Sequence, residues 1–456
     1  MARKLRGAPQ ERRVAGFSAR RAALSLLLAA AAYSLDLPIS GQAHAILAIT
    51  VLSGALWFSE AMPLHVTALL STLLLIVLAS VSPGAAFAPY FNPTIVLFFG
   101  GFMLARAMQK HGLDRQLATR FISRFGSGPR GFLLGAMIIT AFLSMWVSNT
   151  AAAAMMLPIA LFAVSGSRLR PGKSNYGRAV VLGIAFAATI GGIATVVGTP
   201  PNGITVAELS AHGISVNFAE WLYYGLPFAA ILLPIAWLIL TSVYPPEIQE
   251  VSVPKESGGW TLEHGKVLLA ASVAVVLWIT SFLHGIPDSA VAILAVVLLY
   301  LLGLLETADL SKIDWATLLL FGGGLSLGAA MDSSGLFDFM GEALGAAISG
   351  YSGYAVFLFV ISLTVLMTLS ASNTATAALI VPLAASLAEA TGMGIKELAI
   401  MAGIATSIDF IVPVGTPPSA VAYSTGYISV GDMARAGILI TIAGALLLAT
   451  LAWLYW

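Results

Sequence analysis

The sequence predicts an all-α membrane protein that crosses the bilayer many times and is built from two copies of one unit. Of its 456 residues, 59% are hydrophobic and 9% are charged, whereas an ordinary soluble domain carries about 25% charged residues. Apolar runs of about 20 residues recur along the whole chain, which fits helical spans better than the ~10-residue alternation of a barrel. The tripeptide Ser148-Asn149-Thr150 returns as Ser372-Asn373-Thr374, each time deep inside an uncharged apolar block. A matching pair of helix breaks follows, Gly198-Thr199-Pro200-Pro201-Asn202 and Gly415-Thr416-Pro417-Pro418-Ser419.

The apolar runs divide the first half of the chain into a series of expected spans, because each approaches the ~20 apolar residues that a span needs. The expected elements are, in order, spans at 22–38, 42–58, 64–82 and 93–108, an amphipathic basic stretch at 109–127, an uncharged block at 131–167, a span at 177–197 that breaks at 198–202, and a span at 220–243. The basic stretch is expected to be an interfacial helix on anionic lipid, so nucleic-acid binding is not expected.

A hydrophilic segment at 244–266 separates the halves, and the second half repeats the order of the first. Its expected elements are spans at 267–283, 288–305 and 315–330, a Gly-rich and mildly acidic stretch at 331–353, an uncharged block at 354–388, a broken span at 396–423 and a last span at 434–456. Phe99-Gly100-Gly101 matches Phe321-Gly322-Gly323, and His111-Gly112-Leu113 matches Ser334-Gly335-Leu336. Two copies of one unit are therefore expected to form a single core.

The distribution of basic residues predicts the orientation of the chain. With the N-terminus in the cytoplasm and each uncharged block returning to its own side, every Lys and Arg except Lys396 lies on the cytoplasmic side, as the positive-inside rule expects. The C-terminus is then outside, and the repeat is inverted. The basic start of the chain, 1–21, is expected to be a cytoplasmic tail and not a cleavable signal peptide. We expect a multi-pass protein of the inner (plasma) membrane.

Each tripeptide is expected at the tip of a re-entrant helical hairpin. Charge counting does not separate such a hairpin from two full crossings, because both return to the starting side. The arm at 131–147 would be ~25 Å long as a helix, shorter than the ~30 Å hydrocarbon core, and this favours the hairpin. Non-helical backbone at that depth is tolerated only where it is buried in protein or lines a water-filled cavity.

Ser, Asn and Thr at such tips suit an anion and a sodium ion together. Hydroxyl and amide oxygens are hard, neutral ligands for Na⁺, while hydroxyls and the amide nitrogen donate hydrogen bonds to a carboxylate. Thr150 and Thr374 are expected to begin the return helices, whose N-terminal N–H groups favour anions. At the breaks, proline frees a carbonyl for a cation and glycine lets the backbone approach closely.

None of the four motifs contains Lys or Arg. A bound dianion would need another source of positive charge, and Na⁺ beside each tip would offset the desolvation penalty of burying it. A single Ser-Asn-Thr in a membrane protein is more often helix-packing glue, but two copies with two breaks in an inverted repeat favour a binding site. The Phe-Gly-Gly motifs fit close helix packing, and Glu60 and His65, near a span end, fit a structural role.

Asp409 is a carboxylate inside the broken span of the second half, about one turn before Pro413. A charged group at membrane depth is costly and is a functional candidate by default. Three roles stay open from the sequence: a ligand or modulator of a cation near the second tip, a proton carrier, or a hydrogen-bond partner of a neighbouring helix.

The paired Ser-Asn-Thr and Gly-Thr-Pro-Pro motifs, with Glu60-Ala61-Met62-Pro63, Thr67-Ala68-Leu69 and Phe99-Gly100-Gly101-Phe102, resemble the divalent anion–sodium symporter family, whose INDY-type members carry dicarboxylates. The resemblance runs from about residue 50 to the C-terminus. It implies a homodimer with about 11 spans and two re-entrant hairpins per chain. It also implies a scaffold domain that holds the dimer, a transport domain that moves as an elevator, and cotransport of Na⁺ with succinate, malate or fumarate.

The resemblance also implies which residues form the sites. The first sodium site would use Ser144, Ser148, Asn149 and Gly198, and the second would use Thr368, Ala371, Asn373 and Gly415. The substrate carboxylates would meet Asn149, Thr150, Thr199 and Pro200 on one side and Asn373, Thr374, Thr416 and Pro417 on the other. Two residues depart from the family pattern: Asp409, where dicarboxylate carriers are expected to have a small neutral residue, and Ser419, where Asn is more typical.

The two implied domains follow the repeat. The expected division is a basic cytoplasmic tail at 1–21, scaffold helices and the interfacial helix at 22–127, a first transport-domain half at 128–243, a cytoplasmic linker at 244–266, scaffold helices at 267–353 and a second transport-domain half at 354–456.

Taken together, these features predict a sodium-coupled symporter that imports C4-dicarboxylates, with at least two Na⁺ sites, no organic cofactor and no enzymatic activity. The alternatives are a sodium-independent dicarboxylate exchanger and a tricarboxylate or sulfate carrier of the same family. Ser144 and Thr368 favour sodium coupling over exchange. A channel or a membrane enzyme is less well supported, because the spans contain no His/Glu/Asp metal cluster and no nucleophile–base pair.

Overall fold

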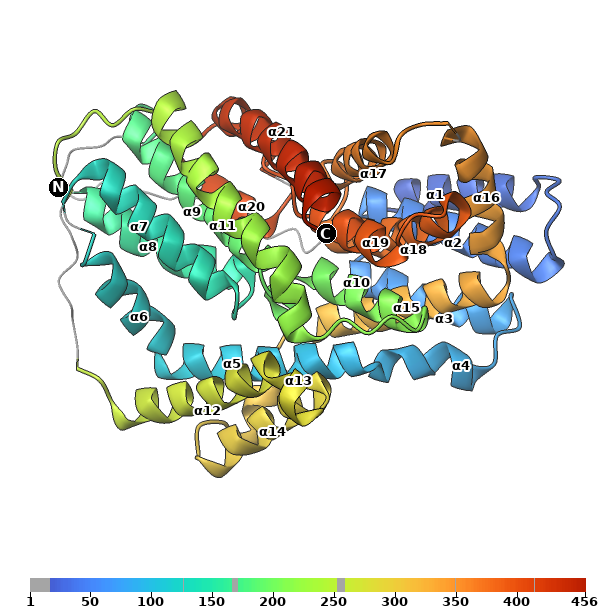
Figure 1. Ribbon diagram of the computed structural model, residues 1–456, viewed down its shortest axis with the longest axis horizontal. Helices are drawn as coiled ribbons and strands as arrows, with labels where there is room; N and C mark the ends of the chain where they lie inside the picture. The colour runs from blue at the N-terminus through green and yellow to red at the C-terminus, as the bar shows by residue number, and fades with distance from the viewer. Residues whose placement is uncertain (1–16, 126, 166–170, 252–258, 349, 414) are drawn as a thin grey trace, which may run out of the picture.

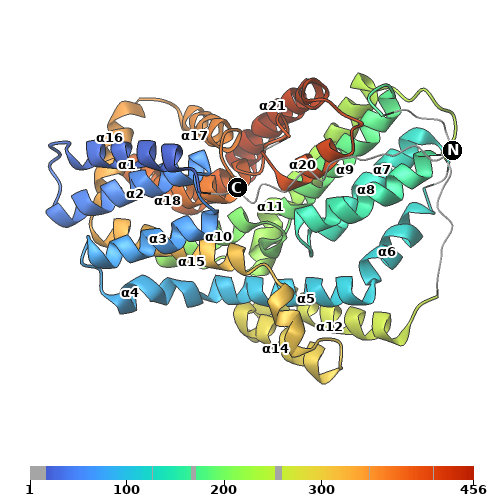
Figure 2. The same cartoon turned by 180° about the vertical axis from the view of Figure 1, so that it is seen from behind.

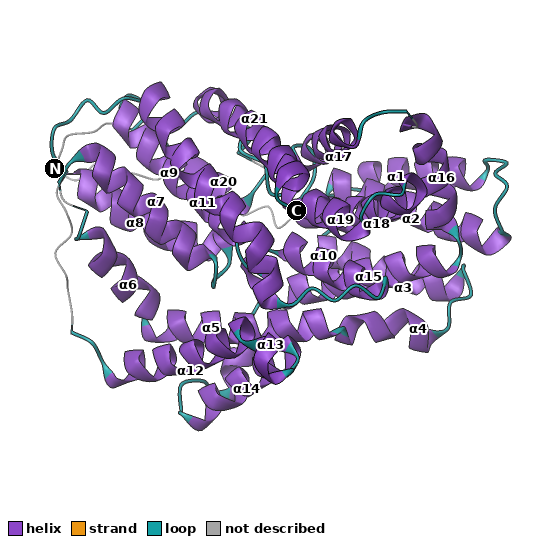
Figure 3. Cartoon of the chain, in the orientation of Figure 1, coloured by secondary structure: helices purple, strands orange, loops and turns teal. Residues whose placement is uncertain are grey.

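The computed structural model describes residues 17–125, 127–165, 171–251, 259–348, 350–413 and 415–456. In these residues all of the regular structure is helical (Figure 3), and eight helices are long and apolar enough to cross a membrane. The prediction of an all-helical, multi-pass membrane protein is therefore confirmed. Most of the predicted tail at 1–21 and part of the predicted linker at 244–266 lie outside the described residues.

The described residues of the first half form eleven α-helices. They are α1 (Ala19–Tyr33), α2 (Gly41–Ser59), α3 (Leu64–Val77), α4 (Pro83–Phe87), α5 (Pro93–His111), α6 (Leu113–Ile122), α7 (Pro129–Ser144), α8 (Asn149–Ser165), α9 (Asn175–Ile193), α10 (Pro200–Ala211) and α11 (Phe218–Val243), with short 3₁₀ turns η1 (Ala88–Phe91) and η2 (Val196–Gly198). Polar caps fix several of the starts: Ser40, Ser174 and Asn217 each accept a backbone N–H from the first turn of their helix.

The second half has a matching series. Its elements are α12 (Leu262–Ile279), α13 (Ser281–His284), α14 (Asp288–Leu301), the 3₁₀ turn η3 (Thr307–Lys312), α15 (Trp315–Ser333), α16 (Leu336–Ile348), α17 (Gly353–Thr368), α18 (Asn373–Thr391), α19 (Ile395–Ala405), α20 (Pro417–Ser424) and α21 (Val430–Leu454). The expected spans correspond to these helices within a few residues. Two helices were missed: the sequence interpretation placed no element at 83–87, where α4 lies, and only a turn at 198–202, whereas α10 begins at Pro200 and continues to Ala211.

Two glycines mark the same point in each half. Gly112, with a φ of 71°, ends α5 and begins α6, and Gly335, with a φ of 72°, lies between α15 and α16. Because a side chain at such a φ is strained, glycine is the residue that turns the chain from a long helix into the helix that follows. These are the positions that the matched tripeptides around Gly112 and Gly335 predict for the repeat.

The two halves interlock through the helices that follow the breaks. In each half two antiparallel helices joined by a short turn form a hairpin, α7 with α8 and α17 with α18. Helix α10, after the first break, packs against α18 and α19, and α20, after the second break, packs against α8 and α9. Figures 1 and 2 show α7, α8 and α9 on one side of the molecule and α16 and α18 on the other, with α10 between them. Each half therefore delivers its broken helix to the hairpin of the other.

Helix α9 lies at the centre of this arrangement. In its window as a candidate span, 94% of the residues are buried, and its glycines allow close approach of the first hairpin. A Cβ on Gly191 would overlap the backbone of Ala141 on α7, so the two helix backbones touch there. Backbone contact thus positions α7, which leads to the first tripeptide, against α9.

An ion cluster joins the end of α5 to η3. The buried carboxylate of Asp309 accepts from Arg106 at 2.9 Å and from Lys110 at 2.8 Å. Burial would raise the pKa of Asp309, but the hydrogen bonds from Lys110, the backbone N–H of Glu306 and Arg106 outweigh it and hold that pKa below its ordinary value. The carboxylate is therefore charged at neutral pH and fixes α5 against the connection between α14 and α15.

We predict that Gly191→Ala destabilises the protein by about 1–3 kcal/mol, because the added methyl forces α7 away from α9. Gly183→Ala on the same helix is the matched control. Its Cβ would meet only the flexible side chains of Leu133 and Met137, and alanine gains up to about 1 kcal/mol of helix propensity. Thermal unfolding of the purified variants in detergent separates the two. Equal melting temperatures for the two variants would contradict the backbone contact.

Candidate functional site

The two tripeptides lie at the turns of the two hairpins. Helix α7 ends at Ser144 and α8 begins at Asn149, while α17 ends at Thr368 and α18 begins at Asn373. The return helices therefore begin one residue earlier than predicted, at the asparagine of each tripeptide instead of the threonine. The serine of the second tripeptide, Ser372, is the N-cap residue of α18. Both asparagines thus sit in the first turn of a helix, where backbone N–H groups have no helical partner.

At the first tip, one buried hydroxyl connects three segments. The Oγ of Ser144 lies 2.7 Å from the side-chain oxygen of Asn149 and 2.6 Å from the carbonyl oxygen of Ala188 on α9. With the Asn149 amide turned by 180°, its nitrogen would donate to Ser144 Oγ at 2.7 Å and to the carbonyls of Ala188 and Gly198 at 3.2 Å each. With the amide oxygen facing Ser144 the tip gathers four oxygens, one hydroxyl, one amide and two carbonyls, and with the amide turned its nitrogen takes the place of the amide oxygen. Hard neutral oxygens at this spacing form a ligand set that suits Na⁺.

The second tip repeats this geometry with different residues. The Oγ1 of Thr368 lies 2.7 Å from the side-chain oxygen of Asn373 and 2.7 Å from the carbonyl oxygen of Thr406 at the end of α19. Thr368 and Thr406 are buried, as Ser144 is at the first tip. The two halves therefore build the same hydroxyl–amide–carbonyl connection from Ser in one case and Thr in the other.

The broken helices provide the other walls. At each break a threonine in extended conformation, Thr199 or Thr416, is followed by two prolines that begin α10 or α20. Proline is preorganised for the first turn of a helix and lacks the N–H that would be unpaired there. In the first break the Asn202 amide donates to the carbonyls of Gly192, Ile193 and Thr195 at 2.9, 3.3 and 2.7 Å. This side chain holds the end of α9 against the start of α10.

Both pairs of motifs face one cavity of about 600 Å³. All eight predicted substrate-contacting residues line it: Asn149, Thr150, Thr199, Pro200, Asn373, Thr374, Thr416 and Pro417. Five of the predicted sodium ligands also line it: Ser148, Asn149, Gly198, Asn373 and Gly415. The two tripeptides, more than 200 positions apart in the chain by their residue numbers, therefore contribute to a single cavity.

The remaining predicted site residues lie outside this cavity. Ser144 and Thr368 are buried, and each contacts the asparagine of its tip without lining the cavity. Ala371 lines a separate apolar groove with Met367 and Leu379. Asp409 is fully buried, and a Cβ on Gly415 would overlap its carboxylate. Asp409 thus lies directly behind a residue that lines the cavity.

One end of the cavity is formed by residues whose role the sequence did not reveal. Glu60, His65, Asp314 and Thr317 line it together with Phe102 and Leu320. Glu60 and His65 were expected to be structural, and their position near the end of a span was the only sequence signal. Asn202 was also missed as the side chain that joins the first break, although it belongs to the quoted motif. Across the described residues no Lys or Arg lines the cavity.

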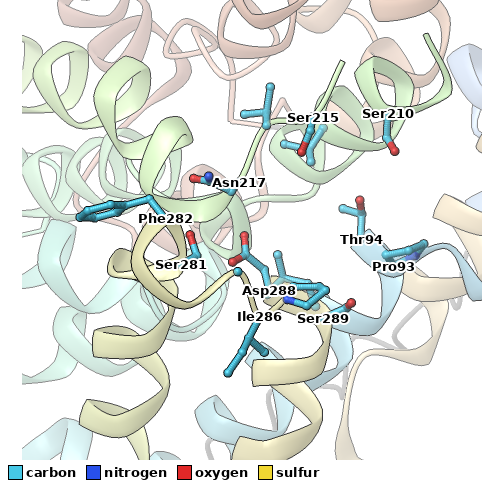
Figure 4. A pocket seen from close by; sticks show the side chains of 15 residues that line it. Pro93, Thr94, Ser210, Ser215, Asn217, Ser281, Phe282, Ile286, Asp288 and Ser289 are labelled. Carbon is cyan, nitrogen blue, oxygen red and sulfur yellow. The ribbon is translucent and has the colours of Figure 1, made fainter. Parts of the chain in front are cut away.

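A second, smaller cavity of about 320 Å³ lies near the starts of α11 and α14 (Figure 4). There the carboxylate of Asp288 accepts from the backbone N–H of Phe218 at 2.6 Å. The ring of Phe218 stacks between Trp146 and Trp278, with centroids 6.1 and 5.1 Å away. This cluster links the turn after α7 and the start of α11 to α12 and α14.

A family model described as the transmembrane region of sodium:sulfate symporters matches residues 19–456. Over 441 residues the chain is 36% identical to an uncharacterized transporter of Haemophilus influenzae, which covers 92% of this chain and 93% of the relative. It is 35% identical over 433 residues to the sodium-dependent dicarboxylate transporter SdcS of Staphylococcus saprophyticus, covering 88% of this chain and 83% of the relative. The SdcS of Staphylococcus aureus is 34% identical over 447 residues, with 91% and 85% covered.

Solved structures show the same fold at low sequence identity. The Alcanivorax borkumensis YdaH transporter superimposes with a TM-score of 0.60 at 15% identity, covering 95% of this chain and 97% of that one. Neisseria gonorrhoeae MtrF superimposes with a TM-score of 0.58 at 12% identity, covering 95% and 94%. The family match over nearly the whole chain confirms the resemblance that the duplicated motifs predict. The chain therefore belongs to the sodium:sulfate symporter family, the divalent anion–sodium symporters, and is a transporter and not an enzyme.

Proposed function

We propose that this protein is a sodium-coupled symporter of C4-dicarboxylates such as succinate, malate and fumarate. The observation that carries the proposal is the convergence of both Ser-Asn-Thr tips and both Thr-Pro breaks on one cavity that no Lys or Arg of the described residues lines. Two carboxylates at the ends of a short chain fit two tips that each offer hydroxyl, amide and helix N-terminal donors. The relatives named sodium-dependent dicarboxylate transporters favour this substrate class.

Sodium ions supply the positive charge that the cavity lacks. Burying a doubly charged anion costs several kcal/mol for each charge unless the charge is compensated. The first ion would be held by Ser144, Ser148, Asn149 and Gly198, and the second by Thr368, Ala371, Asn373 and Gly415. Each asparagine can bind an ion through its oxygen and the substrate through its nitrogen. Ion and anion binding are thereby coupled, because each completes the site for the other.

We place the N-terminus in the cytoplasm of a cell with an inner membrane, and the C-terminus outside. In that orientation Glu60, His65 and Asp314 lie at the cytoplasmic side, so the cavity opens inward. The second cavity, with Asp288 and the stacked rings of Phe218 and Trp278, then lies at the outer side. The hairpins α7–α8 and α17–α18 are in this view re-entrant, with their tips near the middle of the bilayer.

We further propose an elevator mechanism in a homodimer. The scaffold would comprise 22–127 and 267–353, and the transport domain would comprise 128–243 and 354–456. The contacts of Phe218 with Asp288 and Trp278, here called the outer cluster, join the two proposed domains. Phe218 belongs to the proposed transport domain, while Asp288 and Trp278 belong to the proposed scaffold. An outward movement of the transport domain has to break these contacts. They are therefore expected to stabilise the inward-open conformation.

The proposal predicts that labelled succinate accumulates in proteoliposomes above its equilibrium level when Na⁺ is higher outside, because each anion enters with sodium ions moving down their gradient. Replacing Na⁺ by choline should abolish accumulation. Succinate counterflow that persists without Na⁺ would instead indicate a sodium-independent exchanger. Uptake inhibited more strongly by citrate or sulfate than by malate would indicate a carrier of those anions.

Asn149→Ala and Asn373→Ala should each reduce succinate uptake by at least about 100-fold, since each removes a ligand shared by ion and anion, worth roughly 3 kcal/mol. Asn175→Ala is the matched control, because Asn175 lies at the opposite end of α9 and bonds only locally, to Arg178. The readout is initial uptake rate per reconstituted protein. Near-normal uptake in either tip variant would refute the shared-ligand role.

The outer cluster can be tested with a single-cysteine reporter, because the chain contains no cysteine. Thr94→Cys places a thiol in the second cavity, where Thr94 is buried. Asp288→Ala removes one hydrogen bond of about 1 kcal/mol and should raise the rate of labelling by an impermeant maleimide about fivefold. Asp338→Ala, at an exposed carboxylate on α16, is the control and should leave the rate unchanged. No acceleration with Asp288→Ala would argue against a closing role for the cluster.

A further inference from the structure

The two halves of the site differ at Asp409. Counted back from the glycine of the break, Gly198 or Gly415, Asp409 corresponds to Gly192. A second count starts from the carbonyls that accept from the tip hydroxyls, Ala188 in the first half and Thr406 in the second. Counted forward from these carbonyls, Asp409 corresponds to Gly191. By either count the first half has glycine there, and these two glycines admit the Ala141 backbone and the Asn149 amide. The second half therefore carries a carboxylate where the first has no side chain.

Asp409 is buried without compensation. Its exposed fraction is 0%, and neither carboxylate oxygen has a hydrogen-bond partner of normal geometry, although the backbone N–H of Ile411 gives it a weak polar contact. Within the described residues no Lys or Arg forms an ion pair with it. An isolated charge at this depth is costly. A site of this kind calls for a cation.

The carboxylate points toward the second tip. A Cβ on Gly415 would overlap its oxygens, and Gly415 itself lines the central cavity beside Asn373. Only a glycine therefore separates Asp409 from the place where the second ion is proposed to bind. Because glycine has no side chain, it leaves the carboxylate within reach of an ion at the tip.

The second break also lacks the amide that holds the first together. Asn202 donates to three carbonyls of the first break, whereas its counterpart Ser419 exchanges hydrogen bonds with Thr416. The Oγ of Ser407, on the same segment as Asp409, is buried and has no partner. The first break is thus stabilised by a neutral amide that leaves only its own Oδ1 unpaired among the atoms named here, while the second keeps the unpaired Ser407 hydroxyl on the same segment as the Asp409 carboxylate.

We propose that Asp409 is a ligand of the Na⁺ held at the second tip, so that this pocket binds Na⁺ without the dianion and more tightly than the neutral first pocket. The inference rests on the proposed sodium coupling and deepens it. A carboxylate attracts a monovalent cation far more strongly than neutral oxygens do in a low-dielectric site. Binding at the second tip would then come first and would fix Asn373 and Thr374 before the substrate arrives.

The test measures Na⁺ binding directly, apart from transport. The melting temperature of the purified full-length protein is followed against NaCl without dicarboxylate, with choline chloride keeping the ionic strength constant. Asp409→Asn should raise the Na⁺ concentration for half-maximal stabilisation at least about tenfold. Ser144→Ala, which alters the first pocket, should leave this midpoint unchanged, as should Asp338→Asn on the exposed face of α16.

A second readout separates an ion ligand from a structural residue. In choline alone, Asp409→Asn should melt at the same or a higher temperature than the unaltered protein, because it removes an uncompensated buried charge. The double variant Asp409→Gly with Ser419→Asn, which copies the first half, should also lose the stabilisation by Na⁺ alone. An unchanged Na⁺ midpoint in Asp409→Asn would overturn the assignment and leave sodium coupling intact. No stabilisation of the unaltered protein by Na⁺ would overturn both.

Discussion

The structure depends on an electrostatic constraint: a cavity that no Lys or Arg of the described residues lines is proposed to hold a doubly charged anion. Neutral hydroxyl, amide and carbonyl oxygens cannot neutralise such a guest by themselves, and its desolvation costs several kcal/mol for each charge. The same oxygens are good ligands for Na⁺. In the proposed function, Ser144 and Asn149 at one tip and Thr368 and Asn373 at the other would give each end of a dicarboxylate its own cation site. Coupling of ion and anion binding would then follow from charge balance.

The fold meets this constraint by exchanging elements between its halves. Helix α10 packs on the second hairpin and α20 on the first, so each half of the cavity combines a tip and a broken helix. Close backbone contacts at glycines position the helices that lead to the tips, as at Gly191 against Ala141. The two halves match in this arrangement but differ at Asp409, where the first half has glycine.

Much of the fold and the content of the cavity could be predicted from the sequence, since hydropathy and the doubled motifs are local signals. The motifs placed all eight expected anion contacts in one cavity. The rest depended on three-dimensional packing. Helix α10 was missed because its proline start and polar residues interrupt the apolar run, and Asn202 gave no sign that it reaches three carbonyls. Glu60 and His65 line the cavity because α2 ends and α3 begins beside it, which their spacing in the chain does not show.

The two tips are proposed to bind one dianion together, with a sodium ion at each tip. An experimental density map of the protein purified in Na⁺ and succinate tests it most directly. We expect an elongated density between Asn149-Thr150 and Asn373-Thr374. We also expect a compact peak at each tip, which is lost when choline replaces Na⁺. Succinate bound elsewhere, or held by a Lys or Arg side chain, would contradict the account.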